Sequence, residues 1–347
     1  MPLGYDNTLR QTLRHRTNAY DAVTGEFEQR TGLGWHEQVP AQLASADLSV
    51  VIPARNVEYC LPPVLDALAA QSVARKPEVI VIDDGSTDET QAVALGHALA
   101  PIVVATGRRL GAGQARNLGT ALATAATVVY LDADMVVPPR ALAEISARAD
   151  ERLILIGFRH NVAFTKGADG RPVLPDTPAD LSADHRVTWT PPVGTKLLHT
   201  GITLDKPLDG RPLDATDDLR TLGYGRTYYD WDLPRMAVTA LMAAPRKAII
   251  DVGGFHPGFA EIGWGSEDTF LGACLIGTGL MIVPLRHVVG YHLDPPDAAV
   301  SWEEKLATWP ATVELYRRLL EEPPPHGRGA EFTARTEQLL DTCEVKR

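Results

Sequence analysis

Four short apolar runs, each closed by a proline, a glycine or an acidic residue, constrain the fold of this chain more than any other feature. The runs cover residues 48–52, 79–82, 102–104 and 128–131. Short apolar runs bounded by turn residues are typical of strands that are buried on both faces. Helical patterns lie between them. This alternation predicts an α/β fold in which a mostly parallel sheet is flanked by helices.

The segments between and after these runs show helical spacing. Apolar residues in 61–68 and in 115–122 recur every three or four positions, which predicts two helices. Ser86 and Glu89 match a capping box, so a third helix is expected to begin after Ser86. Residues 301–320 predict an amphipathic helix within a helical C-terminal extension.

Two segments do not follow this pattern. Residues 165–215 contain seven prolines and few apolar runs. Long loops without periodic structure are usually functional or disordered, so we expect a long irregular insertion here. The polar residues 1–46 are expected to form an extension that packs on the main domain or trails from it.

The charge balance excludes some classes of partner. The chain has 347 residues with 33 Lys+Arg and 44 Asp+Glu, which gives a formal net charge of −11. Broad binding of nucleic acid needs clustered cations that release counterions, so no nucleic-acid partner is expected. An anionic substrate would be repelled by this charge unless a local cation binds it.

Several features concern the cellular compartment. The three cysteines, Cys60, Cys274 and Cys343, are too few and too scattered for a disulfide framework and predict free thiols. Residues 1–21 lack the apolar core of a signal peptide. The longest uncharged stretch, 269–285, has 17 residues, fewer than the ~20 apolar residues of a membrane span. We expect a soluble, cytoplasmic protein without a membrane span, and the sequence is compatible with a homo-oligomer.

Polar residues follow three of the predicted strands, where each strand ends. They are Arg55, Asp83, Asp84, Asp132 and Asp134. Turn formation alone would explain any one of them. Ligands of open α/β sheets bind at the carboxyl ends of the strands. The sequence therefore predicts an acidic rim at one sheet edge, with no Lys or Arg to pair most of it.

Asp132 and Asp134 form a D-x-D motif around Ala133. Side chains alternate along an extended strand, so both carboxylates are expected on one side. Hard oxygen ligands of this kind suit Mn²⁺ or Mg²⁺. His292 closes a later strand-like run and is the expected third ligand, with His287 as the nearby alternative. A purely structural role is the competing interpretation for a lone histidine.

Residues 111–117 resemble a dinucleotide-binding loop only in part. Gly111 and Gly113 are present, but Arg116 stands where the third glycine belongs, and the preceding run is the third strand. We expect instead that this loop brings a helix N-terminus to a nucleotide or phosphate, with Arg116 as a counter-charge.

The segment 263–268 reads Gly-Trp-Gly-Ser-Glu-Asp. Ser266 is a suitable N-cap, and acidic residues in a first helical turn are favoured by the helix dipole, so a structural role is one interpretation. In the other, the glycines expose the indole of Trp264 beside the carboxylates of Glu267 and Asp268. An aromatic face beside an acid is suited to holding a sugar and removing a hydroxyl proton.

Taken together, these motifs resemble those of the family 2 glycosyltransferases, which have the GT-A fold. The matching segments, in the order and spacing of the family, are 50–56, 81–88, 113–119 and 132–134. Residues 263–268 resemble the G-W-G-x-E-D segment of chondroitin-polymerase-like enzymes and of β-1,4-galactosyltransferases. Residues 291–295 resemble the metal-binding histidine segment of the polymerase group.

The resemblance implies a role for each candidate residue. Donor binding is implied for Pro53, Ala54, Arg55, Asp84, Arg116, Asp132 and Ala133. Metal binding is implied for Asp134 and His292, with Asp132 beside them. Asp268 would be the catalytic base, next to Glu267. Trp264 and Gly265 would contact the acceptor.

The implied activity is that of a metal-dependent, inverting glycosyltransferase with Mn²⁺ or Mg²⁺ as cofactor. It would move a sugar from a nucleoside-diphosphate sugar, expected to be a UDP-sugar, to a hydroxyl of a small-molecule, oligosaccharide or peptide acceptor. A sugar-nucleotidyltransferase and a non-catalytic carbohydrate-binding protein are the alternatives. Five regions follow from this interpretation: an extension (1–46), a nucleotide-sugar-binding half (47–160), an insertion with the acceptor region (161–235), an acceptor and catalytic half (236–298) and a helical extension (299–347).

Overall fold

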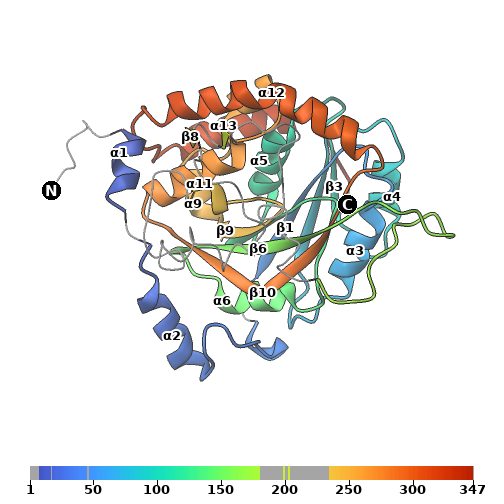
Figure 1. Cartoon of the computed structure of the whole chain (residues 1–347), viewed down its shortest axis with the longest axis horizontal. Coiled ribbons are helices and arrows are strands. Elements are labelled where there is room, and N and C mark those ends of the chain that lie inside the picture. Colours follow the sequence, from blue (N-terminus) through green and yellow to red (C-terminus); the bar gives the residue numbers. More distant parts are fainter. Residues whose placement is uncertain are drawn as a thin grey trace.

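The computed structural model describes residues 8–16, 18–44, 47–179, 198–199, 202–203 and 234–346 (Figure 1). Most of the expected insertion at 165–215 lies outside the described residues. The part of it that the structure describes is irregular, with an isolated bridge between Lys166 and Pro172 and two two-residue strands. These strands, β7 (Leu198–His199) and β8 (Ile202–Thr203), pair with each other.

A nine-stranded sheet forms the centre of the molecule, in the order β11-β3-β2-β1-β4-β9-β6-β10-β5. The strands are β1 (Leu48–Ala54), β2 (Glu78–Asp83), β3 (Ile102–Ala105), β4 (Thr127–Leu131), β5 (Met135–Val136), β6 (Leu153–Val162), β9 (Leu241–Pro245), β10 (Met281–Leu293) and β11 (Glu344–Lys346). All four apolar runs that the sequence singled out are strands, so the predicted α/β class is confirmed.

The sheet is mixed: six of its nine strands run in one direction, as expected of a mostly parallel sheet, and β5, β9 and β11 run against them. Strands β3, β2, β1 and β4 are parallel to one another, as predicted from the strand–helix alternation. Beyond β4 the direction changes, because β9 enters between β4 and β6 and is antiparallel to both. Strand β10 is parallel to β6, whereas the edge strands β5 and β11 are antiparallel to their neighbours.

Helices cover both faces of the sheet (Figure 1). They are α1 (Leu9–Arg14), α2 (Asp21–Thr31), α3 (Leu61–Ala69), α4 (Thr90–Gly96), α5 (Ala112–Leu122), α6 (Ala141–Arg148), α9 (Arg246–Asp251), α10 (Pro257–Ile262), α11 (Glu267–Gly277), α12 (Ala298–Leu319) and α13 (Gly329–Leu340), with short 3₁₀ turns at Ala41–Leu43 and Pro234–Met236. Successive residues of β1 pack into different cores: Val51 joins α5 and α11, while Val50 and Ile52 join α3 and α6. Burial on both faces explains why this strand reads as a continuous apolar run.

The capping box predicted at Ser86 is absent. Helix α4 begins at Thr90, and Glu89 occupies its N-cap position without a side-chain cap. The hydroxyl of Ser86 instead accepts the N–H of Asn56 at 3.0 Å, and the Asn56 side-chain oxygen accepts the N–H of Thr87 at 2.8 Å. Ser86 therefore joins the loop after β2 to the loop after β1.

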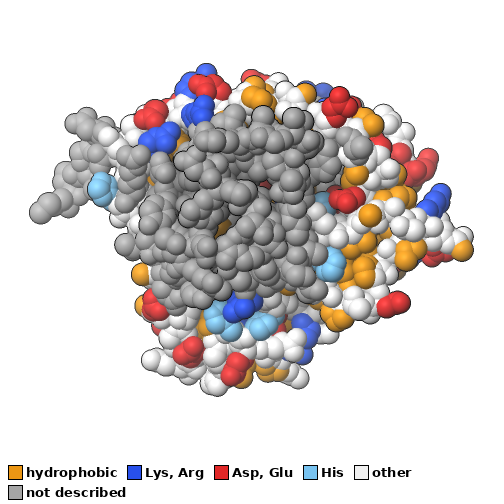
Figure 2. All heavy atoms as spheres, in the orientation of Figure 1, with side chains coloured by type: hydrophobic (Ala, Val, Ile, Leu, Met, Phe, Trp, Pro, Cys, Tyr) orange, Lys and Arg blue, Asp and Glu red, His pale blue; other side chains and the backbone are white. Residues whose placement is uncertain are grey.

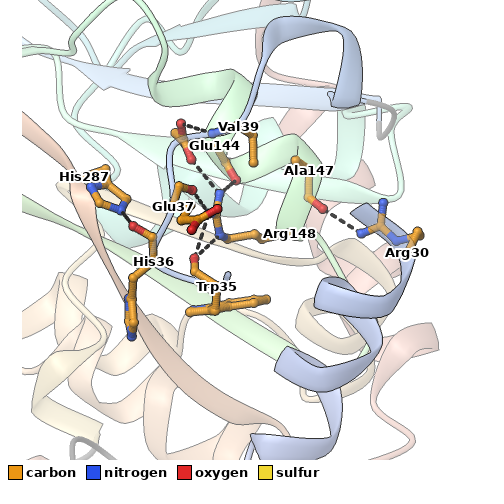
Figure 3. Close-up of polar contacts among 9 residues, drawn as sticks. All are labelled: Arg30, Trp35, His36, Glu37, Val39, Glu144, Ala147, Arg148 and His287. Atoms are coloured by element: carbon orange, nitrogen blue, oxygen red, sulfur yellow. Dashed lines mark hydrogen bonds and ion pairs between the residues drawn. The ribbon is translucent and has the colours of Figure 1, made fainter. Parts of the chain in front are cut away.

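The described part of the N-terminal extension packs on the main domain. Leu9 and Leu13 of α1 are fully buried in the core beside α11. The side chain of Asn18 pairs with both main-chain groups of Ile282 at 2.8 Å, which anchors the segment to β10. Figure 3 shows a second anchor: the guanidinium of Arg148 on α6 donates to the main-chain oxygens of Trp35 and Glu37.

The C-terminal extension is helical, as expected, and returns to the sheet. Helix α12 begins at Ala298, three residues earlier than predicted, and crosses above α5 and α11 in Figure 1. After α13, strand β11 pairs with β3 at the edge of the sheet. Among the described residues, no helix is both long enough and apolar enough to cross a membrane.

Candidate active site

The carboxyl ends of β1, β2 and β4 meet at one edge of the sheet, because these strands are parallel neighbours. The loops that follow them contain Arg55, Asp84, Asp132 and Asp134, as the sequence predicted. Strand β10 adds His292 to the same edge, where it pairs with Met135 of β5 and with Asn161 of β6. The site is therefore assembled from both halves of the sheet.

Asp132, Asp134 and His292 form a compact cluster. One candidate ligand atom from each residue lies within 4.8 Å of the others. The Nε2 atom of His292 is 3.5 Å from Oδ1 of Asp134. His287, the alternative considered from the sequence, contacts the main-chain oxygen of His36 instead (Figure 3). The structure thus brings together the three residues expected to bind a metal and separates the competing histidine from them.

The chemistry of this cluster fits a divalent cation. Oδ1 of Asp134 is buried and, within the described residues, accepts no hydrogen bond. Burial raises the pKa of Asp134, and the negative charge of Asp132 adds to this effect although His292 opposes it. Two carboxylates and an imidazole are donors that Mn²⁺ accepts, and a bound cation would stabilise both negative charges.

Arg116 pairs with the acidic rim, which the sequence analysis expected to be largely unpaired. Its side chain is only 5% exposed, and Nη2 donates to Oδ1 of Asp132 at 2.6 Å. Burial raises the pKa of Asp132, but the positive charges of Arg116 and His292 outweigh burial and hold it below its usual value. Arg116 is therefore an internal partner of Asp132 rather than an open counter-charge at the surface.

Asp84 binds the loop that leads into α5. Its Oδ1 and Oδ2 accept the main-chain N–H groups of Leu110 and Gly111 at 2.5 and 2.9 Å. Burial raises the pKa of Asp84, whereas these two hydrogen bonds lower it. The helix N-terminus that we expected to approach a phosphate is thus next to a carboxylate of the protein. Arg55 is exposed beside Asp84 and lowers the pKa of that carboxyl.

The other residues expected to bind the donor differ in exposure. Pro53 is half-buried, whereas Ala54 and Ala133 are 1% and 4% exposed. The main-chain oxygen of Ala133 accepts a hydrogen bond from the thiol of Cys60 at 3.4 Å. Ala54 and Ala133 therefore shape the floor of the site, and among these residues Arg55 is the exposed one.

Trp264 lies at the surface, as expected, with 38% of its area exposed. Its ring stands edge-to-face with Trp309 of α12 at 6.1 Å between centres, and Nζ of Lys305 lies 5.7 Å from its centre. Gly263 allows this close packing, because a Cβ atom there would lie 2.6 Å from Thr308 of α12. Sequence reasoning missed Trp309 and Lys305, which belong to a helix that it treated only as an extension.

Ser266 occupies the N-cap position of α11 but does not cap it. Its φ is 66°, its side chain makes no capping bond, and its buried Oγ has no partner among the described residues. Oε2 of Glu267 accepts the N–H of Gly265 at 3.0 Å, and Oδ1 of Asp268 accepts the N–H of Thr269 at 2.7 Å. The two acidic side chains satisfy N–H groups at this helix end instead.

Burial controls the ionisation of these two carboxyls. It raises the pKa of Glu267 to about 7, helped by the adjacent charge of Asp268 and opposed by Arg116. It also raises the pKa of Asp268, against Arg116 and the Thr269 hydrogen bond. Desolvation therefore opposes the ionised form of Asp268, whereas its position in the first turn of α11 would by itself favour that form.

Further charges face the site from two other elements. Arg159 of β6 lowers the pKa of both Asp132 and Asp268, and Lys305 of α12 lowers that of Asp134. Neither residue belongs to a recognisable sequence motif, because each lies inside an ordinary strand or helix pattern. On the described part of the face in Figure 2, basic and acidic side chains are interspersed without a large patch of one sign.

Part of the chain is similar to a known protein family. Residues 49–190 match the family Glycosyl transferase family 2. The matched segment includes Asp84, Arg116, Asp132 and Asp134, so the resemblance inferred from the motifs is supported for this part of the chain. It does not include residues 263–268 or His292, and the resemblance of the G-W-G-x-E-D segment stays a prediction.

Two curated relatives are both undecaprenyl-phosphate 4-deoxy-4-formamido-L-arabinose transferases. The one from Enterobacter sp. (strain 638) is 31% identical over 116 residues, and the one from Klebsiella pneumoniae is 33% identical over 117. Each match covers 32% of this chain and 36% of the relative. The matched segment therefore spans about a third of the length of these relatives.

A solved structure shares the fold. The crystal structure of GalNAc-T7 with UDP, GalNAc and Mn²⁺ superimposes with a TM-score of 0.50 at 22% identity. The superposition covers 73% of this chain and 45% of that one. The similarity supports a GT-A type α/β fold with a central sheet flanked by helices.

Proposed function

We propose that this chain is a glycosyltransferase that uses a nucleoside-diphosphate sugar and a divalent metal ion. The observation that carries the proposal is the Asp132–Asp134–His292 cluster, whose candidate ligand atoms lie within 4.8 Å of one another at the carboxyl edge of the sheet. This is the edge at which open α/β sheets bind nucleotides. A transfer reaction needs a group that stabilises the leaving diphosphate and a group that activates the acceptor. The metal-binding cluster would be the first, and the separate carboxylate pair on α11 would be the second.

The donor would bind over β1, β2 and β4. Asp132, Asp134 and His292 would hold Mn²⁺ or Mg²⁺, which stabilises the negative charge of a leaving diphosphate. Asp84 keeps the loop before α5 in place through Leu110 and Gly111, and Arg55 lies exposed beside it. These residues form the expected nucleoside side of the site. A UDP-sugar is the proposed donor.

The acceptor would bind against Trp264. Aromatic faces pack on sugar rings, and the indole is exposed next to the first turn of α11. Asp268 is the proposed base that accepts the proton of the attacking hydroxyl in a single, inverting displacement. Glu267 is the less suitable base, because its hydrogen bond to Gly265 ties it to the loop that contains Trp264, whereas the bond of Asp268 goes to Thr269 of its own helix.

Two findings on other proteins support the donor and the cofactor. The curated relatives are named as transferases of a modified arabinose, and the structure of GalNAc-T7 contains UDP, GalNAc and Mn²⁺. We extend this chemistry to the present chain. Its metal dependence, its inverting mechanism and its acceptor are all parts of what we propose.

The experiment is a donor-turnover assay with a panel of UDP-, GDP- and dTDP-sugars, with Mn²⁺ and then with a chelator. We expect release of the nucleoside diphosphate from one class of donor, lost in the chelator and lost in Asp134→Ala. A sugar-nucleotidyltransferase would instead release pyrophosphate from a nucleoside triphosphate and a sugar phosphate. Nucleotide or sugar binding without turnover of any donor would contradict the proposal and indicate a carbohydrate-binding protein.

A further inference from the structure

Arg116 is a buried cation that binds a donor-side carboxylate and is held in place through the residue that follows it. Arg116 is 5% exposed and donates to Asp132 at 2.6 Å, while its Cζ lies 5.6 Å from the centre of the Phe255 ring. The next residue, Asn117, pairs with both main-chain groups of Phe255, at 2.8 and 2.9 Å. Helix α5 is thereby fixed to the turn that leads towards α10 and α11, so Arg116 has a defined position relative to both halves.

Most of the hydrogen-bonding capacity of Arg116 is not used by Asp132. A guanidinium has five N–H donors in a rigid fork. Its Nε and Nη1 are buried, and within the described part of the chain neither has an acceptor. Buried polar groups without a partner are rare in folded proteins, and each needs a specific reason. The charges of acidic groups that act on this guanidinium supply such a reason here.

Those groups are Glu267 and Asp268 at the start of α11. Burial lowers the pKa of Arg116, but the negative charges of Asp132, Glu267 and Asp268 together raise it above its usual value. In return, the charge of Arg116 lowers the pKa of Glu267 and of Asp268, against the burial that raises them. Other charges that face Asp268 are Asp132 and Arg159, which oppose each other.

We propose that Arg116 is a positioning residue whose single positive charge serves the two half-sites at once, holding Asp132 on the donor side and the Glu267–Asp268 pair on the acceptor side. The inference rests on the proposed function, because it assigns these carboxylates to donor and acceptor chemistry. Arg116 acts through them and does not touch the reacting atoms. Loss of its charge would leave more of the acceptor-side pair protonated at neutral pH and unable to accept a proton.

Two substitutions separate the two roles of Arg116. Methionine keeps much of the length and apolar stem but removes the charge. Lysine keeps the charge but replaces the planar fork by a single ammonium group. Arg116→Met should therefore affect both half-sites. Arg116→Lys should preserve the electrostatic effect on the Glu267–Asp268 pair and impair only the geometry at Asp132.

The first test is the pH profile of transfer at saturating donor and acceptor. In Arg116→Met the acidic limb should move upward by about one pH unit, as loss of an opposite charge near a carboxyl predicts. Its rate should be reduced by up to ~10-fold below the original limb and recover in alkaline buffer. In Arg116→Lys the limb should stay in place while the donor KM rises.

The second test does not depend on activity. In metal-free protein labelled with carbon-13 at its Glu and Asp carboxyls, NMR should show the titration of the pair at higher pH in Arg116→Met than in the wild type or Arg116→Lys. Glu267→Gln identifies the resonance. If no donor is turned over but this shift is present, the proposed function fails and the role of Arg116 stands.

Three results would overturn the inference. One is an unchanged carboxyl titration in folded Arg116→Met. Another is a loss of rate that is uniform across pH in that variant. The third is an acidic limb in Arg116→Lys that moves upward by about one pH unit from its wild-type position, and this result decides the question even if Arg116→Met does not fold. Melting temperatures, measured for all variants, distinguish a chemical effect from partial unfolding.

Discussion

Asp134 shows at the scale of a residue why a bound cation would stabilise the proposed site. Its carboxylate is desolvated and lies beside Asp132, so both burial and repulsion oppose its ionised form. His292 is the nearest partner, at 3.5 Å, and is half-buried itself. A divalent ion would remove both unfavourable effects, because its charge would replace the lost hydration.

Three variants test the metal cluster: Asp134→Ala and His292→Ala remove a proposed ligand, and His287→Ala is the matched histidine control. We expect Asp134→Ala and His292→Ala to weaken Mn²⁺-dependent binding of UDP by more than the ~10–100-fold that is typical when only an outer partner of a metal ligand is lost. His287→Ala, which alters the contact with His36, should bind like the wild type. Isothermal titration calorimetry measures this. Equal affinity in all variants, or in the presence of EDTA, would show that no metal links these residues to the nucleotide.

The acidic pair on α11 predicts a difference between two conservative variants. Asp268→Asn should lower kcat by ~10²–10⁴-fold, the usual effect of losing a general base. In the proposed function the donor is held by the metal cluster and beside Asp84, so donor affinity should be unchanged. Glu267→Gln should retain more activity. Nearly normal turnover in Asp268→Asn with a lowered melting temperature would make Asp268 a helix-end residue, and Glu267 would then be the base.

The raised pKa of Glu267 also predicts how the stability of the folded protein depends on pH. Burial raises its pKa from 4.5 to about 7 in the folded protein, so the folded state holds this proton more tightly than the unfolded state. Its contribution to stability is complete below about pH 4.5 and is lost as pH rises through about 7. Glu267→Gln should therefore be more stable than the wild type at alkaline pH, by on the order of 1–3 kcal/mol, and not at acidic pH. Urea unfolding at both pH values measures the difference, and an equal effect at the two would rule out this ionisation.

At the scale of elements, local patterns predicted the parts that depend on local burial. Strand β1 is apolar throughout because both faces are covered, and the helical spacing of 61–68 and 115–122 matches α3 and α5. The start of α4 was predicted wrongly, since Ser86 hydrogen-bonds to Asn56 of a neighbouring loop and does not cap its own helix. The place of β9 between β4 and β6 depends on non-local pairing that no local pattern encodes.

The loop before α5 gives a prediction for Asp84. In Asp84→Asn one of the two oxygens becomes an NH₂ group, which cannot accept the N–H of Leu110 or Gly111. We expect a loss of about 1–3 kcal/mol of stability, the typical effect of an unsatisfied buried N–H, together with a donor KM raised by ~10-fold or more. Asp83→Asn is the matched control, because among the described residues the Asp83 side chain accepts one N–H, that of Ser86. Unaltered donor kinetics in Asp84→Asn would exclude a role for Asp84 at the nucleoside.

At the scale of the whole molecule, the sequence predicted the candidate site better than its surroundings. The motifs located Asp132, Asp134 and His292, because each follows or closes a recognisable strand. Arg116, in contrast, was expected to face a ligand and is buried against Asp132, since the packing of α5 on the sheet is not visible in the sequence. Lys305 and Trp309 reach Trp264 only because α12 folds back over α11, which is a tertiary event.

A buried ion pair on α6 helps to attach the N-terminal segment to the sheet domain, because its arginine also binds that segment. Loss of this arginine should therefore lower stability. Nη1 of Arg148 lies 2.5 Å from Oε2 of Glu144 within α6, both side chains are at most 2% exposed, and Arg148 also donates to Trp35 and Glu37 (Figure 3). Arg148→Met leaves the Glu144 carboxylate buried without its partner, so we expect a loss of about 3–5 kcal/mol. Arg152→Met is the matched control.

The control removes the same charge from a surface position. Arg152 pairs with Glu26 and Asp150, but 39% of its side chain is exposed, so its loss should cost at most about 1 kcal/mol. Urea unfolding measures both variants, and limited proteolysis should cut Arg148→Met first between α2 and β1, where the lost bonds to Trp35 and Glu37 lie. The double variant Arg148→Met/Glu144→Gln should recover part of the stability, because the uncompensated charge is then removed. Equal stability of the two single Arg variants would mean that the Arg148 contacts add nothing to this attachment, which would then rest on Asn18 and on the apolar contacts of Phe27, Trp35 and Val39.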